Sequence, residues 1–482
     1  MGSHQTTTVT TNEKFEFTAG IRKALHIMMG VGIVGLLLVY IFNPENGHAR
    51  FWSNILLNTY YFTGISLFGL FIVAAAQLAY GGWHTLIKRV LISMGAFSMI
   101  GGFLLLFTLI TGLLGWHNLY DHVKHILHDH HNEKYTNKHI FFNPPFWVAR
   151  VLIYAIAWAA LSYAFDKFFG EKNQIDPKVY KQSKLLSALF IVVFAVTESF
   201  VSWDMVMSLD PHWYSTLFGW YNFASYGCAG WAMSILLVIF LKSRGYLQAV
   251  NENHIHDLGK FLFGFSIFWT YLWFSQFMLQ WYGNIPEDTN FWVKRFNTGY
   301  FKFTIFLSLI INFLFPLLFL IKRSAKRNFK MIGFGAALLF FGHYIDFFNY
   351  TAFEPVVREA THDSHHGGGH SSVSQRFTLL AEVHGEHNAP AEKAPTSDVP
   401  SHADVHLQNT AAPAHAPKHE SHGSHSHATA HFATIGLGEL MIFAGFLGLF
   451  LYFCFSRLSK RNLIVENDPY LEECKRLTVT WA

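Results

Sequence analysis

The feature that most constrains this chain is a succession of long apolar segments. A transmembrane helix needs about 20 mostly apolar residues to cross the hydrocarbon core of a bilayer. Ten segments meet this length: 22–43, 53–81, 88–116, 146–170, 181–209, 214–242, 260–282, 300–322, 330–352 and 433–457. Charged residues make up only 14% of the chain, against about 25% in a soluble domain. The sequence therefore predicts an all-α polytopic membrane protein with about ten transmembrane helices.

Two of these segments need a decision about their ends. A polar stretch from Gly2 to Phe17 precedes the first segment, which is too long for a signal-peptide core and lacks an A-x-A cleavage site, so we interpret it as a retained helix. Segments 181–209 and 214–242 are separated only by Asp210-Pro211-His212. A proline after a long apolar run favours a tight hairpin between two helices over one kinked helix.

The basic residues predict how the helices are oriented. With both termini in the cytoplasm, 23 of the 35 lysines and arginines fall on the inner side and 12 on the outer side. The positive-inside rule supports this orientation. The chain then divides into a cytoplasmic tail, nine helices, an outer loop, a tenth helix and a second cytoplasmic tail, at 1–21, 22–352, 353–432, 433–457 and 458–482.

The histidines gather in two outer loops. Of the 29 histidines, seven lie between His117 and His139 and fourteen between His362 and His431. The second stretch is also rich in Ala, Pro, Ser and Gly, which cannot bury enough apolar surface to fold alone. Imidazole groups with spacing suited to Zn²⁺ or Ni²⁺ occur at His365, His366, His370, His422, His425 and His427. Because neither cysteine nor a fixed backbone accompanies them, we favour adventitious metal binding over a specific site.

A short sequence motif occurs twice in the chain and bears on the architecture. Phe146-Trp147-Val148-Ala149-Arg150 opens the fourth helix, and Phe291-Trp292-Val293-Lys294-Arg295 lies just before the eighth, 145 residues later. Extended by chain order, this offset pairs helices 2–5 with helices 6–9 as two four-helix bundles, flanked by helices 1 and 10. An even number of spans per repeat gives a parallel repeat about an axis along the membrane normal. Aromatic residues with arginine are also typical of any interface belt.

Ionisable residues at membrane depth are costly, so each is a functional candidate. Glu198 and Asp204 lie in segment 181–209, while His343 and Asp346 lie three residues apart on one face of segment 330–352. The 145-residue offset places Glu198 and His343 at matching positions. Carboxyl and imidazole chains are the usual elements of proton relays, so these four are candidates for a proton pathway in the outer half of the bilayer. For Gln276, Gln280 and Glu439 we favour interhelical hydrogen bonding.

The sequence disfavours a redox centre held by this chain alone. A bis-histidine haem needs two histidines at similar depth, but His26 lies toward the inner side and His343 toward the outer side. An iron–sulfur cluster needs four thiolates, and Cys228, Cys454 and Cys474 are too few and too far apart. We therefore expect no catalytic residue, metal or cofactor in the chain itself.

Aromatic pairs mark the outer interface. Trp203-Asp204, Trp213-Tyr214 and Trp281-Tyr282 are typical of the aromatic belt of membrane proteins, and we favour that interpretation. A quinone headgroup also favours aromatic rings beside a carboxylate and a histidine, so the outer end of the helices remains an alternative site.

Several of these runs together resemble a known family. They are Ser202–Gly219 (SWDMVMSLDPHWYSTLFG), His256–Lys260 (HDLGK), Trp269–Tyr271 (WTY) with Phe274–Phe277 (FSQF), and Trp281–Glu287 (WYGNIPE). This set resembles the F subunit of bacterial alternative complex III, over roughly helices 5–9 and more loosely over helices 1–4. The His-rich stretch lies outside the resemblance.

The resemblance implies a place in a respiratory assembly. Alternative complex III oxidises quinol in the bacterial inner membrane and passes electrons to cytochrome c or directly to a terminal oxidase. Its F subunit belongs with the polysulfide-reductase (NrfD-type) membrane subunits, which have two four-helix bundles. In this family haem c and iron–sulfur clusters sit in partner subunits, and the quinol site is assigned to a sister NrfD-like subunit. The F subunit carries no cofactor and is proposed to provide support and a proton half-channel.

Two functions from other classes stay open. A stand-alone secondary transporter predicts two discontinuous helices with Gly or Pro breaks at matched positions. Only Pro316 lies well inside a span, and the position 145 residues earlier is Glu171, in an expected loop. A metal-uptake protein would use the His-rich loop.

Overall fold

The computed structural model describes residues 13–42, 48–121, 123, 136–210, 213–352 and 435–477. Its regular structure in these residues is helical, apart from one isolated β-bridge between Lys14 and Asn462. The His-rich loop 353–432, with the histidines considered above as metal ligands, and the Pro211-His212 turn lie outside the described residues.

Ten helical stretches are long and apolar enough to cross a membrane, as the sequence predicts. They comprise α1 (Ala19–Phe42), α2 (Ala49–Leu78), η2 (Thr85–Ile87) with α3 (Lys88–Met94) and α4 (Ser98–Leu113), α7 (Pro144–Glu171), α8 (Pro177–Met205), α9 (Leu217–Ser243), α10 (Glu252–Gly283), α12 (Gly299–Leu309) with η5 (Ile310–Leu314) and α13 (Phe315–Phe319), α15 (Phe329–Thr351) and α18 (Leu437–Leu458). Short helices α6 (Thr136–Phe141), α11 (Pro286–Asn297), α14 (Arg323–Arg327) and α19 (Leu471–Lys475) lie between or after them.

The largest difference from the predicted ends is at α10, which begins eight residues before the predicted position 260. Asn251 caps this helix by accepting hydrogen bonds from the backbone N–H groups of Asn253 and His254, and the His254 side chain completes a capping box. A polar first turn with its own cap is stable as a helix beyond the apolar run. Hydropathy alone therefore places the start of α10 too late in the sequence.

Two spans are interrupted. The third is broken between α3 and α4 at Gly95–Phe97, and the eighth contains the π-helical turn η5 just before Pro316. Proline has no N–H to donate, so the preceding turn loses a helical hydrogen bond and widens. This explains the wider turn at Ile310–Leu314.

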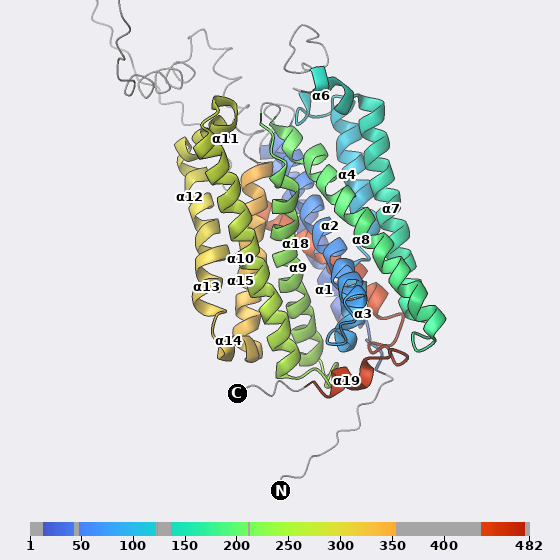
Figure 1. Ribbon diagram of the computed structural model, residues 1–482. Coiled ribbons are helices and arrows are strands. Elements are labelled where there is room, and N and C mark those ends of the chain that lie inside the picture. The colour runs from blue at the N-terminus through green and yellow to red at the C-terminus, as the bar shows by residue number, and fades with distance from the viewer. Residues whose placement is uncertain are drawn as a thin grey trace, which may run out of the picture. The chain divides into compact units, whose positions relative to one another are not determined.

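The helices pack in a recurring order around two central members, α2 and α9 (Figure 1). α2 packs against α4 and α8, and α7 joins α4 to α8. In the same way α9 packs against α10 and α15. The span α12–α13 lies between those two helices: α12 contacts α15, α13 contacts α10, and η5 contacts both. α2 and α9 pack against each other, and both are mostly buried.

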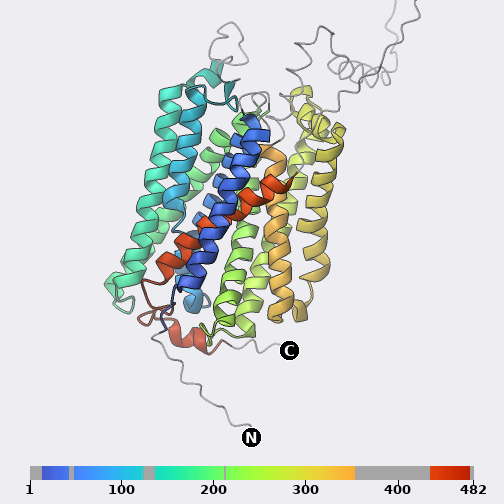
Figure 2. The ribbon, with the colours of Figure 1, turned by 180° about the vertical axis from the view of Figure 1, so that it is seen from behind.

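Helices α1 and α18 form a closely packed pair outside these helices (Figure 2). Their crossing depends on glycine, since a Cβ atom at Gly32 would lie 2.4 Å from the Cα of Gly445. A Cβ at Gly35 would lie 2.7 Å from that of Met441. Small residues that let two backbones approach are the usual basis of helix association in a bilayer, where no hydrophobic driving force acts between helices.

The close approach at Gly32 gives a first prediction. Gly32→Ala is expected to lower the free energy of unfolding by about 1–3 kcal/mol, because the added methyl group meets backbone atoms that cannot move aside. Gly30 lies on the same helix with no heavy atom within 4 Å of an added Cβ, so Gly30→Ala is the matched control and should be neutral. Thermal unfolding in detergent measures both variants. Equal melting temperatures for the two would contradict the glycine-dependent crossing.

Candidate functional site

Asp204, the first of the predicted site residues, forms an ion pair. Its carboxylate oxygens accept hydrogen bonds from Arg150 of α7, at 2.6 Å from Nη2 and 3.2 Å from Nε. Arg150 also donates through Nη1 to the carbonyl of Phe141 at 2.9 Å, and its guanidinium lies over the Phe141 and Phe146 rings. Asp204 is fully buried. A two-point contact between arginine and a carboxylate is among the strong hydrogen-bonding arrangements in proteins, so Asp204 joins α8 to α7.

Asp346 is buried on α15 with three neutral donors. Ser225 Oγ donates to its Oδ2 at 2.8 Å, and Trp269 Nε1 donates to the same oxygen at 3.0 Å. The Tyr221 hydroxyl donates to Oδ1. Tyr221 and Ser225 come from α9 and Trp269 from α10. Asp346 thus joins three helices with hydroxyl and indole groups in the role that Arg150 has at Asp204.

His343 shares Ser225 with Asp346. Its Nδ1 lies 3.0 Å from Ser225 Oγ. Since the one hydroxyl proton of Ser225 goes to Asp346, the Nδ1 atom of His343 must carry the proton it donates to Ser225. Nε2 is then an unprotonated acceptor, and it is buried without a hydrogen-bond partner among the described residues. The structure therefore brings two predicted residues into one group, which we name the α15 cluster: His343, Asp346, Ser225, Tyr221 and Trp269.

Glu198 forms a separate polar group on α8. Its Oε1 accepts from Ser202 Oγ at 3.2 Å and its Oε2 from Ser199 Oγ at 3.4 Å. The hydroxyls of Ser202 and Tyr60 lie 2.8 Å apart, and the Tyr226 hydroxyl is close to the Glu198 carboxyl. Like Asp346, Glu198 has neutral donors, and it is buried.

Helix α9 reaches both groups. Ser225 belongs to the α15 cluster, and the next residue, Tyr226, lies beside Glu198. No described hydrogen bond runs from one group to the other. The four predicted pathway residues are therefore divided among an ion pair at Asp204, the Glu198 group and the α15 cluster.

The 145-residue offset has a structural counterpart. Arg150 matches Arg295, and each guanidinium lies over the phenylalanine four residues before it, at 4.6 Å from the Phe146 ring and 3.5 Å from the Phe291 ring. Asp204 matches Asn349, so the acid that pairs with the first arginine is replaced by an amide in the second half.

A small cavity with a mixed polar and aromatic lining lies beside Asp346. Its volume is about 10 Å³, and Arg295, Ser308 and Asn349 line it together with Asp346. This is close to the space that one water molecule needs. Asp346 thus lies about one helical turn before Asn349, the position 145 residues after Asp204, and it faces a cavity that Arg295 also lines.

Of the three residues predicted to form hydrogen bonds between helices, two have such a bond and one has none among the described residues. Gln280 Oε1 accepts from Trp292 Nε1 at 2.6 Å, as interhelical bonding predicts. Glu439 accepts from Arg50 Nε of α2 at 2.6 Å and from the Gly436 backbone at 2.9 Å. Gln276 is buried, and neither polar atom of its side chain has a partner in the described part of the chain.

The residues considered for redox centres lie apart. His26 is exposed on α1 next to the Tyr452 ring, whereas His343 is buried on α15. Cys228, Cys454 and Cys474 are buried free thiols on three different helices. Within the described residues no three His, Cys, Asp or Glu side chains are grouped to hold a metal ion.

The aromatic pairs at the outer ends also differ in their surroundings. Trp281 and Tyr282 are exposed, as expected for a belt. Trp203, Trp213 and Tyr214 instead line a cavity of about 300 Å³ together with Lys138 and Asp210. The site suggested above for a headgroup therefore has a cavity, which residues from two of the three groups line.

A polar cluster at the opposite end of the helices has no signal in the sequence pattern. Lys88 Nζ donates to Asp468 Oδ2 at 2.8 Å and to Gln77 Oε1 at 3.3 Å. This buried pair docks the segment after α18 onto the start of the third span, and Cys474 Sγ donates to the carbonyl of Trp83 nearby. Residues 380 positions apart form the pair, so only a three-dimensional structure reveals it.

The ion pair at Asp204 gives a second prediction. Asp204→Asn leaves the Arg150 charge buried and unpaired, and we expect it to cost about 3–5 kcal/mol of unfolding free energy. Asp166 pairs with Arg461 at 3.5 Å in a half-buried position. Asp166→Asn is the control and should cost about 1 kcal/mol or less. Chemical denaturation in detergent compares them, and similar losses would show that Asp204 is no tighter a contact than Asp166.

The docked C-terminal segment gives a third prediction. Burial and the neighbouring Lys88 lower the pKa of His84 to about 3, from an ordinary value of 6.5. The undocked segment therefore takes up the proton more readily, so docking is fully stable above about pH 6.5 and weakens as the pH falls toward 3. Hydrogen exchange of residues 460–477 should show faster opening at pH 5.5 than at pH 7.5, after correction for intrinsic rates.

The control replaces the titrating group. The Nδ1 atom of His84 lies 2.9 Å from the Gly81 carbonyl and donates to it, and His84→Asn keeps a donor there without the titration. This variant should lose the part of the pH dependence that His84 contributes, and the part that remains is assigned to His254, which is buried against the Cys474 carbonyl of the same segment. An unchanged pH dependence in His84→Asn would assign the effect to another group.

Comparison with known proteins identifies no family. No protein-family model matches the sequence, and no curated protein is significantly similar to it.

Proposed function

We propose that this chain is a membrane subunit of a respiratory quinol-oxidising complex of the alternative complex III type. In this proposal it binds no redox cofactor, supports the assembly and forms part of a proton pathway coupled to quinol oxidation. The observation that carries the proposal is the α15 cluster, in which a buried carboxyl and a buried imidazole share one hydroxyl and the imidazole has an open nitrogen. Buried ionisable groups inside a helical membrane protein mark proton and ion routes.

The packing of the helices supports the proposed architecture. We assign α2, the η2–α4 span, α7 and α8 to one four-helix bundle, and α9, α10, the α12–α13 span and α15 to a second. Within each set the first helix packs against the second and fourth, and the third closes the ring. The equivalent stacking of Arg150 and Arg295 supports a parallel repeat. Two such bundles are the architecture that the sequence resemblance implies.

The α15 cluster has the connectivity of a short proton relay. A proton that reaches Nε2 of His343 allows its Nδ1 proton to move to Ser225 Oγ, while the Ser225 proton moves to Asp346. The imidazole ends as the Nε2–H tautomer and Asp346 ends protonated, so one proton has crossed the cluster and no charge is lost. The small cavity that Asp346 and Arg295 line lies beside the carboxyl at the end of this relay.

The remaining parts of the proposal concern the surroundings. The inner excess of basic residues supports both termini in the cytoplasm of a bacterial cell, with the chain in the inner membrane. The quinol, the haem c groups and the iron–sulfur clusters belong to partner subunits: a multihaem cytochrome, an iron–sulfur protein and a sister NrfD-like subunit. A terminal oxidase is a further partner of the assembly.

A stand-alone secondary transporter fits less well. Its inverted or parallel repeats would place broken helices at matched positions. Here the breaks lie at Gly95–Phe97 in the second helix of one set and at Ile310–Leu314 in the third helix of the other. The metal-uptake alternative depends on the loop 353–432, which lies outside the described residues.

The proposal predicts the behaviour of the assembled complex. In proteoliposomes supplied with quinol and oxidised cytochrome c, Asp346→Asn and Glu198→Gln should lower the number of protons translocated per electron. Both variants keep the shape of the side chain but cannot ionise. Haem and iron–sulfur content should stay at the wild-type level, and Asp166→Asn at a half-buried position should leave coupling unchanged.

Two results would contradict different parts of the proposal. Unchanged coupling in both variants would exclude the pathway but leave the subunit assignment. Purification of the chain in mild detergent without a multihaem cytochrome or an iron–sulfur protein would exclude the assignment itself.

A further inference from the structure

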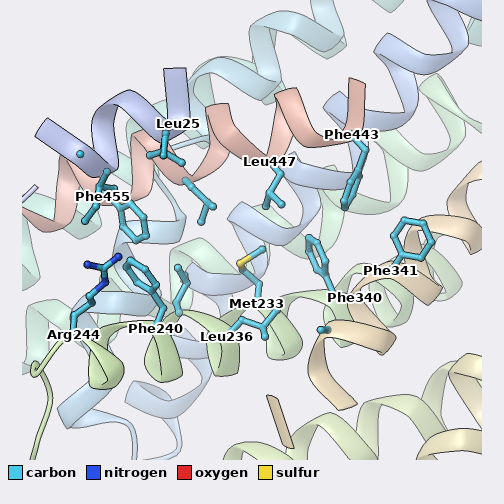
Figure 3. Close-up of a pocket in the computed structure, with 16 residues that line it drawn as sticks. Leu25, Met233, Leu236, Phe240, Arg244, Phe340, Phe341, Phe443, Leu447 and Phe455 are labelled. Atoms are coloured by element: carbon cyan, nitrogen blue, oxygen red, sulfur yellow. The ribbon is translucent and has the colours of Figure 1, made fainter. Parts of the chain in front are cut away.

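An apolar groove runs between the flanking helices and the central ones (Figure 3). It lies among α1, α18, α9 and α15 and has a volume of about 590 Å³, well within the range of about 300–1,000 Å³ that is usual for ligand sites. Figure 3 shows phenylalanine rings along it, with Arg244 at one end. The side chains that define it include Met233, Phe240, Phe340, Phe443, Leu447 and Phe455.

The charge at one end of the groove is positive. Arg244 follows the last turn of α9, where the chain leaves the apolar span, and its side chain is exposed. It is the one charged residue among those lining the groove. Arg22 and Lys23 are exposed on the first turn of α1, next to the groove residues Gly20 and Ile21. The groove thus has a long apolar part that ends at the Arg244 side chain, and two more exposed cations follow its lining residues Gly20 and Ile21 in the sequence.

We propose that this groove binds one anionic phospholipid, with an acyl chain along the phenylalanine rings and the phosphate at Arg244. An acyl chain is flexible and apolar and matches the lining, and arginine binds phosphate oxygens through two parallel N–H groups. Basic pockets between transmembrane helices are known to take anionic headgroups. A hydrophobic helix from a partner would fill the apolar part but would give Arg244 no counter-charge. The inference does not depend on the proposed function.

The site has a structural consequence for the flanking pair. α1 and α18 hold each other through glycine contacts, and α1 has few contacts with the central helices. A lipid in the groove contacts α1 and α18 on one side and α9 and α15 on the other. It therefore ties the pair to the rest of the protein, and delipidation should loosen α1 first.

The test measures lipid retained by the full chain in mild detergent. Native mass spectrometry after titration with phosphatidylglycerol, and with phosphatidylcholine of identical acyl chains, gives the two affinities. We expect a single phosphatidylglycerol to bind more tightly than phosphatidylcholine. Arg244→Gln should weaken phosphatidylglycerol by about fivefold, the effect of one cation near a membrane surface, and leave phosphatidylcholine unchanged.

Two further variants make the result specific. Arg323 is an exposed arginine on α14, at the same end of the helices but not among the groove residues, and Arg323→Gln should not change binding. Leu447→Trp fills the groove and should abolish retention of both lipids. Equal weakening in Arg244→Gln and Arg323→Gln would reduce the effect to general surface charge. Retention that survives Leu447→Trp would place the lipid elsewhere and overturn the proposal.

Discussion

Compensation of buried charge within a low-dielectric helical interior is the constraint on which the polar structure of this protein depends. A carboxylate there must find donors locally, because the hydrocarbon region supplies none. Asp204 is compensated by a cation, whereas Asp346 and Glu198 are compensated by neutral hydroxyl and indole donors. Under the proposed function, this difference favours Asp346 and Glu198 over Asp204 as the acids that take up and release a proton. Protonation of Asp204 would leave Arg150 as an uncompensated buried charge, but protonation of Asp346 leaves its three hydrogen-bond donors neutral.

Two parts of the chain each have a buried arginine stacked on a phenylalanine, but the acid near the arginine is placed differently. Arg150 and Arg295 lie 145 residues apart, and each stacks on a phenylalanine four residues earlier. In the first half the matched acid contacts the arginine directly, while in the second half that position is Asn349 and the acid lies one turn away at Asp346. A displacement of one turn therefore separates a closed ion pair from a carboxyl that faces a water-sized cavity.

Hydropathy could predict the ten spans because each is an uninterrupted apolar run, and spacing could place His343 and Asp346 together because they share one helix face. The 145-residue offset between the two five-residue motifs at 146–150 and 291–295 is more useful than the motifs themselves, since it also relates Asp204 to Asn349. The donors Ser225, Tyr221 and Trp269 could not be predicted, because neutral polar residues occur throughout these helices and only packing decides which face an acid. The pairing of Lys88 with Asp468 depends on how the chain returns after α18, which no local pattern records.

Helix α9 is the element that relates the two acids to each other. Ser225 and Tyr226 are consecutive, so their side chains differ in direction by about 100° around the helix axis, and they reach the α15 cluster and the Glu198 group respectively. The ring of Tyr226 packs directly against α2 at Gly64, where an added Cβ atom would lie only 2.7 Å from the ring. Helix α9 packs against both α2 and α15, so the two acids are placed by one and the same helix even though no described hydrogen bond joins them.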